Sequence, residues 1–141
     1  MFKQMIAVSG GFDPVHIGHL RMFEAAKKLG NHLTVIVNSD AWLTRKKGDF
    51  FMPAVERAEI IKGFRCVDRV IIQKFDRNDV SEELRELRPD IFANGGDRKN
   101  SCDIPETAIC EFLGIKMIFN VGGGKIQASS KLQENYKPNK K

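Results

Sequence analysis

The sequence lacks the features that would place it in a membrane or in a disulfide-rich class. No apolar run approaches the ~20 residues that a helix needs to cross a bilayer, and the N-terminus shows neither a signal-peptide core nor a cleavage site. Its three cysteines are odd in number and contain no C-x-x-C pair, which argues against a disulfide framework and a cysteine zinc site. Internal repeats and low-complexity segments are also missing. These absences predict a cytoplasmic globular protein with free thiols and no membrane partner.

The net charge of the chain is also small outside its C-terminal end. The whole chain of 141 residues carries +5 and has a pI near 9.2, values that suggest a polyanionic partner. Residues 125–141, however, hold +4 of this charge, so that residues 1–124 are nearly neutral. We therefore interpret residues 137–141 as a solvated basic tail and predict no nucleic-acid partner.

Apolar, β-branched runs alternate along the chain with segments of helical periodicity. Such alternation with continuous apolar strands is typical of a parallel sheet covered on both faces. We therefore predict one doubly wound, Rossmann-like α/β domain over residues 1–136, with a five-stranded parallel sheet. The predicted strands are 5–8, 33–37, 70–72, 91–93 and 116–119; the predicted helices are 20–29, 53–64, 81–87 with Ser81 as its cap, 106–113, and one that begins at Ser129.

Glycine runs follow three of these strands directly, at residues 10–11, 95–96 and 122–124. In a doubly wound sheet, ligands bind beyond the carboxyl ends of the strands, and glycine allows backbone N–H groups to approach a phosphate or a base. A single run could equally be a tight turn. Three runs at one edge of one sheet favour a shared ligand.

The densest motif is Gly-Gly-Phe-Asp-Pro-Val-His-Ile-Gly-His at residues 10–19, and it holds two of the three histidines. His16 and His19 are three residues apart, so they can share one face of the first helical turn. Two imidazoles at a helix N-terminus can hold a phosphate whose charge rises during a reaction. Two alternatives remain, a metal site made with Asp13 and a purely structural role for the histidines.

Cations and hydroxyls complete the expected edge of the sheet. Arg45-Lys46-Lys47 stands after the second strand and before Gly48, either as a solvated loop or as a group that binds an anionic substrate. Arg57 follows one helical turn after Pro53 and could face the same edge. Ser129 and Ser130, at the start of the last predicted helix, suit a terminal phosphate.

Together these motifs resemble the nucleotidyltransferase superfamily of cytidylyl- and adenylyltransferases, from about residue 5 to residue 135. Residues 10–19 match the family pattern G-x-F-D-x-x-H-x-G-H, and residues 88–97 resemble the ADP-heptose synthase nucleotidyltransferase domain. Glycerol-3-phosphate cytidylyltransferases usually have G-D-D-W where residues 95–98 here read Gly-Gly-Asp-Arg, and short archaeal FAD synthetases share the layout. Ala128 departs from the family's I-S-S/T-T signature. The H-I-G-H letters also occur in class I aminoacyl-tRNA synthetases, but no K-M-S-K-S follows.

The resemblance implies that a substrate phosphate on a sugar or polyol attacks the α-phosphorus of ATP or CTP and releases pyrophosphate, with ATP favoured. A CTP-dependent glycerol-3-phosphate enzyme and a non-catalytic nucleotide-binding regulator remain alternatives. Mg²⁺ would offset the triphosphate charge without a metal site in the protein, and a homodimer would form with help from residues 65–70. The catalytic residues would be His16, His19 and Lys46; the nucleotide-binding residues Gly10, Gly11, Phe12, Asp13, Gly18, Gly95, Gly96, Asp97, Ser129 and Ser130; and the substrate-binding residues Lys46, Lys47 and Arg57.

Overall fold

The computed structural model describes residues 4–75, 77–95 and 104–122. Gly96, Asp97, Ser129 and Ser130, together with the helix expected from Ser129 and the tail at 137–141, lie outside the described residues. The elements in chain order are β1 (Met5–Gly10), α1 (Ile17–Lys27), β2 (His32–Val37), α2 (Asp40–Lys47), α3 (Ala54–Lys62), β3 (Arg69–Ile72), α4 (Ser81–Leu87), β4 (Ile91–Ala93), α5 (Thr107–Leu113) and β5 (Lys116–Ile118).

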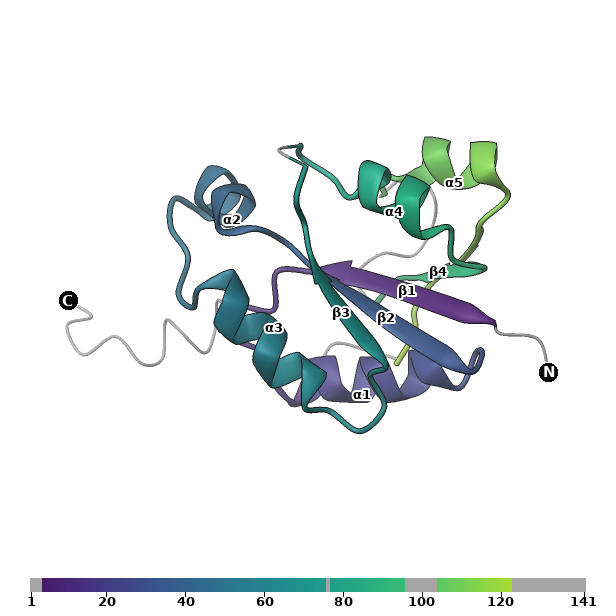
Figure 1. Cartoon of the computed structure of the whole chain (residues 1–141), viewed down its shortest axis with the longest axis horizontal. Helices are drawn as coiled ribbons and strands as arrows, with labels where there is room; N and C mark the ends of the chain where they lie inside the picture. The colour runs from purple at the N-terminus through teal and green to yellow at the C-terminus, as the bar shows by residue number, and fades with distance from the viewer. Residues whose placement is uncertain (1–3, 76, 96–103, 123–141) are drawn as a thin grey trace.

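The five strands form one parallel sheet, as the sequence predicts, and the structure gives their order as β3-β2-β1-β4-β5 (Figure 1). The chain builds β1, β2 and β3 outward in one direction and then returns to place β4 on the other side of β1. The strand order therefore reverses between β1 and β4, which is the position where doubly wound sheets bind their ligands. The segment that follows β1 is residues 11–16, so the histidine motif begins at this point.

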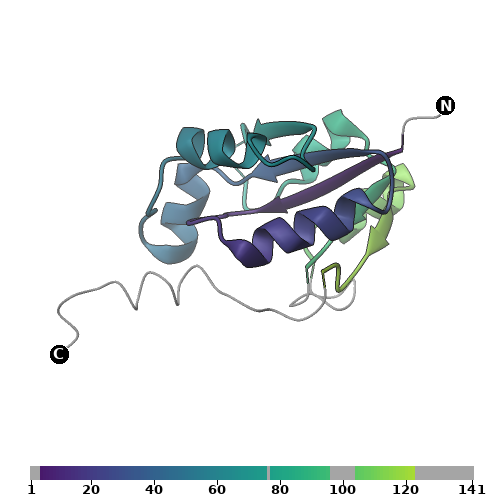
Figure 2. The ribbon, with the colours of Figure 1, turned by 90° about the horizontal axis from the view of Figure 1, so that it is seen from below.

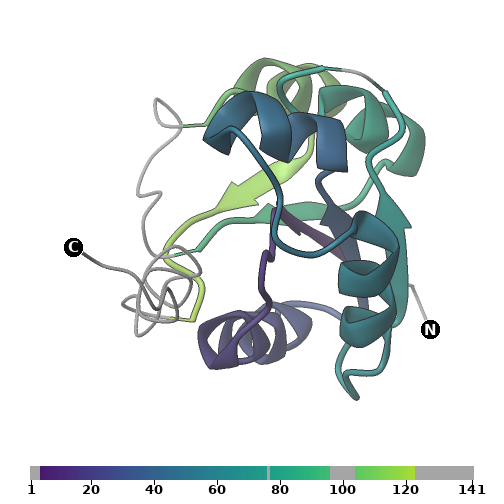
Figure 3. The same ribbon diagram turned by 90° about the vertical axis from the view of Figure 1, so that its left-hand side faces the viewer.

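Helices cover both faces of the sheet (Figure 3). On one face, α1 packs against β1 and β2, and α3 packs against β2 and β3, with Phe23, Ala26 and Ile61 in the core between them. Helix α1 runs beside the sheet roughly along the strands (Figure 2). On the other face, α4 and α5 contribute Leu84 and Cys110 to a second core. Because successive strand side chains point to opposite faces, neighbouring residues of β1 enter different cores. No helix among the described residues is long and apolar enough to cross a membrane.

Helix α2 is the main departure from the predicted elements. No helix was predicted over these residues, and the Arg45-Lys46-Lys47 group, for which a solvated loop was one of two interpretations, forms the last turn of the helix. Ser39 Oγ accepts a hydrogen bond from Trp42 N (3.0 Å) and caps the start, and Gly48 ends the helix with φ of +90°. The expectation that Ser81 caps α4 was also wrong, because Val80 occupies the cap position and no side chain bonds there.

Candidate functional site

His16 and His19 form a reciprocal cap at the start of α1. The Nδ1 atom of His16 accepts a hydrogen bond from Gly18 N (3.1 Å), and Nδ1 of His19 accepts one from His16 N (3.1 Å). The two rings stack with their centroids 3.8 Å apart. The first four N–H groups of a helix have no partner within the helix. The histidines occupy the two positions at which serine and glutamate side chains usually accept hydrogen bonds from such groups.

This cap determines how each imidazole can meet a ligand. A ring nitrogen that accepts a hydrogen bond carries no proton, so the neutral form of each ring has its proton on Nε2. Both histidines therefore present an N–H donor at the end of the ring away from the backbone. Two such donors beside the positive end of α1 favour an anion, and the phosphate role expected from the sequence stays a prediction.

Phe12 supports His19 from inside the molecule. Its ring is buried and meets the His19 ring edge-on, with centroids 4.9 Å apart. The backbone of Phe12 has φ of +53°, which is rare for a residue with a side chain. A Cβ atom at Gly10 would lie 2.9 Å from this ring, so glycine at position 10 leaves the room that Phe12 occupies.

Asp13, expected to bind the nucleotide or a metal, instead holds the segment that leads into α3. Its side chain is 3% exposed, and its two oxygens accept hydrogen bonds from Phe51 N and Met52 N, both at 2.6 Å. Among the described residues, no group of three His, Cys, Asp or Glu side chains is placed to hold a metal ion. The structure therefore gives no support to the alternative of a metal site at this motif.

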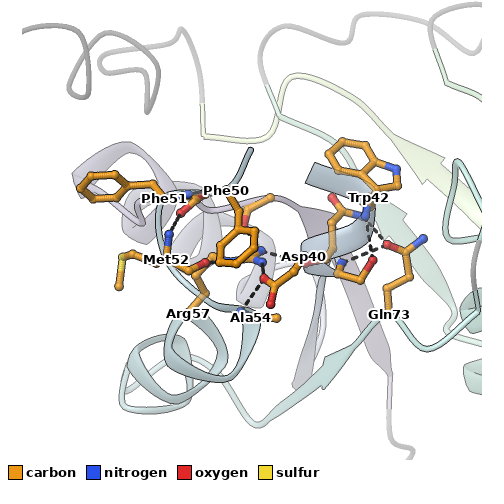
Figure 4. A network of polar contacts seen from close by, with 12 residues as sticks. Asp40, Trp42, Phe50, Phe51, Met52, Ala54, Arg57 and Gln73 are labelled. Carbon is orange, nitrogen blue, oxygen red and sulfur yellow. Dashed lines mark hydrogen bonds and ion pairs between the residues drawn. The ribbon is translucent and has the colours of Figure 1, made fainter. Parts of the chain in front are cut away.

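Arg57, expected to bind an anionic substrate, is fully buried (Figure 4). Its guanidinium donates to Met52 O (2.8 Å), Gly11 O (2.7 Å) and Asn38 O (2.8 Å), and forms an ion pair with Asp40 (2.7 Å). Burial of a cation is costly unless it is paired and hydrogen-bonded, and Arg57 meets both conditions. Its charge is thus used within the protein, between the ends of β1 and β2.

The exposed cations among the predicted site residues lie on α2. Trp42 precedes Lys46 by one helical turn, and Lys46 Nζ lies 5.5 Å from the centroid of the Trp42 ring. Lys47 is also exposed. The Trp42 indole donates to Asn78 O (2.9 Å), so this side chain is fixed to the loop after β3. Both lysines at the end of α2 are thus exposed, and their binding of a substrate stays a prediction.

Polar residues that the sequence reasoning missed place α2 at the carboxyl edge of the sheet. Gln73, at the end of β3, accepts hydrogen bonds from Asn38 Nδ2 and Ser39 N and donates to the carbonyls of Arg77 and Asp79. Asp40 accepts from Ala54 N (2.8 Å) as well as from Arg57. These polar residues could have been found from the sequence because they come soon after predicted strands. Asn94 and Gly95, which was predicted to bind the nucleotide, follow β4 in the same way.

Comparison with known proteins agrees with this arrangement. Residues 7–119 match the family described as Cytidylyltransferase-like. The chain is 39% identical over 103 residues to the FAD synthase of Pyrococcus horikoshii, covering 72% of this chain and 68% of that protein. It is 38% identical over 112 residues, or 78% of its length, to the bifunctional protein HldE of Streptomyces coelicolor, of which it spans only 24%.

A solved structure, that of the lipopolysaccharide core biosynthesis protein from Thermoplasma volcanium GSS1, matches 84% of this chain and 94% of its own, with a TM-score of 0.68 and 28% identity. The family match covers all of the described sheet except the first two residues of β1, and it includes the motif that begins with Gly10 and ends with His19. With this fold, this motif and these relatives, the chain belongs to the cytidylyltransferase-like family of nucleotidyltransferases.

Proposed function

We propose that this protein transfers a nucleoside monophosphate from a nucleoside triphosphate, with ATP favoured over CTP, to a small phosphorylated acceptor and releases pyrophosphate. The observation that carries the proposal is the histidine pair, which caps α1 through its two Nδ1 atoms at the switch point of the sheet. Such donors stabilise charge as it grows on the phosphate oxygens of the transition state.

The reaction needs positioning and charge stabilisation rather than a covalent intermediate. In the proposed mechanism, an acceptor phosphate oxygen attacks the α-phosphorus, and the bond from that phosphorus to the bridging oxygen of pyrophosphate breaks. His16 and His19 donate to the phosphate oxygens as they gain charge. Backbone N–H groups of Gly11 and Phe12 donate to the triphosphate, and Lys46 holds the acceptor phosphate.

Mg²⁺ is proposed to arrive with the triphosphate as part of the substrate. The carboxylate within the motif, that of Asp13, already accepts hydrogen bonds from two backbone N–H groups. The part of the chain that the structure describes places no three His, Cys, Asp or Glu side chains together as metal ligands. Magnesium commonly binds through substrate phosphates and water with few protein ligands. We assign no step of the reaction to the ion.

The acceptor is proposed to be a sugar or polyol phosphate. Support comes from the match to the HldE proteins and from exposed lysines that suit a phosphate on a small polar molecule. The similarity to FAD synthases favours a second candidate, FMN. Both acceptors present a phosphate monoester, so both can use the same lysine.

A pyrophosphate-release assay tests these assignments. ATP and CTP are each combined with a heptose 1-phosphate, glycerol 3-phosphate and FMN. Release with one sugar or polyol phosphate supports the proposal, whereas release with FMN alone assigns the second candidate. Tight nucleotide binding without release from any pair would instead indicate a non-catalytic nucleotide-binding protein.

Paired lysine variants then identify the acceptor-binding residue. We expect Lys46→Met to raise the KM for the acceptor by about tenfold or more, because a charge-assisted contact is lost, and Lys47→Met to have a smaller effect. The reverse order would assign the role to Lys47. Lys62→Met, on the exposed side of α3, serves as the matched control and should leave both kinetic constants unchanged.

We also propose that the protein is a homodimer. Strand β3 lies at one edge of the sheet, and the Arg65–Val70 stretch leads into it with several partly exposed residues. A strand edge of this kind has backbone groups available for a second chain. Light scattering coupled to size-exclusion chromatography should give twice the chain mass, and a single chain mass would contradict the proposal.

A further inference from the structure

We propose that Arg57 is a positioning residue that aims the Phe12 backbone N–H at the triphosphate, an inference that rests on the proposed function. The guanidinium lies behind the turn that follows β1, and its Nη1 atom donates to Gly11 O at 2.7 Å. The carbonyl and the N–H of one trans peptide point in opposite directions. A donor that holds Gly11 O on the inner side therefore turns Phe12 N–H to the outer side.

Arg57 donates to the carbonyls of three peptides, and these peptides differ in the partner of the N–H group on the opposite side. The Asn38–Ser39 peptide follows the geometric rule, since Ser39 N donates away from Arg57 to Gln73 Oε1 at 3.1 Å. The Met52–Pro53 peptide has no N–H, because its second residue is proline. This leaves the Gly11–Phe12 peptide.

The N–H of Phe12 has no acceptor in any of the ranges 4–75, 77–95 and 104–122. A backbone donor without a protein partner is normally taken up by water or a ligand. It lies between the end of β1 and the histidine cap, four residues before His16, at the place where the strand order reverses. Among the three peptides, it is therefore the one that can serve an anion.

The conformation of Phe12 explains why a fixed support is needed. Its φ of +53° is unfavourable for a residue with a side chain, so the turn must be held by its surroundings. Arg57 supplies the hold on the carbonyl side, and Asp40 keeps the guanidinium in place through the 2.7 Å ion pair. The cation is fully buried, so it acts on the reaction through this peptide and not through direct contact with substrate.

Arg57→Lys tests the assignment because it retains the charge beside Asp40 but not the planar fork that reaches three carbonyls at once. We expect kcat to fall on the order of 10²-fold, the usual cost of one misplaced oxyanion donor, with a smaller change in the KM for the nucleotide. The matched control is Lys27→Met, which breaks the 2.6 Å ion pair with Asp68 at the opposite end of the strands. It should lose some stability and keep the wild-type kcat.

A nuclear magnetic resonance measurement keeps the inference testable if Arg57→Lys fails to fold. On addition of saturating nucleoside triphosphate, the Phe12 amide proton of the wild-type protein should move downfield, and in Arg57→Lys the movement should be much reduced. An unmoved Phe12 amide in the nucleotide-bound wild type would overturn the inference. So would a loss of kcat in Arg57→Lys that matches only its unfolded fraction. Absence of turnover in the wild type would refute the proposed function alone, since the amide shift is still read with bound nucleotide.

Discussion

Replacement of His16 separates its two functions, because the ring uses one nitrogen for the helix and the other for the ligand. Asparagine places Oδ1 near the position of Nδ1 and is among the best N-cap residues, but it has no donor as far out as Nε2. We therefore expect His16→Asn to keep the hydrogen bond from Gly18 N and to lose the phosphate contact. Alanine removes both.

The magnitudes follow from the contacts. His16→Ala loses one cap bond of about 1 kcal/mol, while the reciprocal bond from the backbone of residue 16 to His19 Nδ1 remains. For a domain of this size, that corresponds to a fall in Tm of roughly 3 °C. Both variants should lose about 10²- to 10³-fold in kcat, the range measured when a preorganised donor to a developing oxyanion is removed.

Thermal unfolding and the pyrophosphate-release assay measure the two effects separately. His16→Gln is the complementary variant, since its longer amide places a donor near the position of Nε2 and makes a poor cap. It should therefore lose stability like alanine and retain more activity than asparagine. If His16→Asn were as unstable as His16→Ala, the cap would not explain the stability; if it kept full turnover, Nε2 would have no part in the reaction.

Three further predictions concern stability. Burial, and then the nearby charge of Glu106, raise the pKa of Cys110 to about 11, so the folded state favours the protonated thiol. The contribution of Cys110 to the free energy of unfolding should therefore be constant below about pH 9 and fall by up to about 3 kcal/mol between pH 9 and 11. Chemical denaturation of Cys110→Ala should not show this fall. Thr34 Oγ1 is buried and has no hydrogen-bond partner within the described chain, so Thr34→Val should raise the free energy of unfolding by about 1 kcal/mol in urea titrations; a decrease would show that the hydroxyl is satisfied. Burial raises the pKa of Asp68, but the hydrogen bond and charge of Lys27 outweigh it and the net pKa is lowered, so its contribution to stability is present above about pH 4 and is lost at lower pH; Asp68→Asn should flatten this acid limb of the unfolding curve.

The sheet could be predicted because its information is local. Runs such as Val35–Val37 are apolar throughout, and a glycine or proline stands beside each helical segment, so hydrophobic period and turn residues agree. Helix α2 could not be predicted in this way. Only Leu43 of its eight residues is buried, so it has almost no apolar stripe, and it is held by polar contacts from Gln73 and Asn78, which are distant in sequence.

The placement of His16 and His19 together at the start of a helix could be predicted, since it is contained in one helical turn, and their binding of an anion stays a prediction. The roles of Asp13 and Arg57 could not be predicted. Each is a charged side chain beside a predicted site, and that pattern alone is compatible with ligand binding. What decides their roles is burial and the carbonyl or N–H groups that meet them from other segments, near residues 11, 38 and 52.

The charges around the motif therefore fall into two groups that burial separates. Asp13 and Arg57 are buried, and they bind backbone groups of the turns on which the site is built. The groups that we propose to bind the ligand are the histidines that cap α1, the Phe12 N–H and the lysines of α2. If Asp13 or Arg57 bound a ligand in place of its backbone partners, those partners would lose their hydrogen bonds at a cost of several kcal/mol. Neutral imidazoles and peptide N–H groups can bind the substrate without such a loss. The site can thus stay rigid before the nucleotide arrives, and preorganised dipoles of this kind are what a phosphate with rising charge requires.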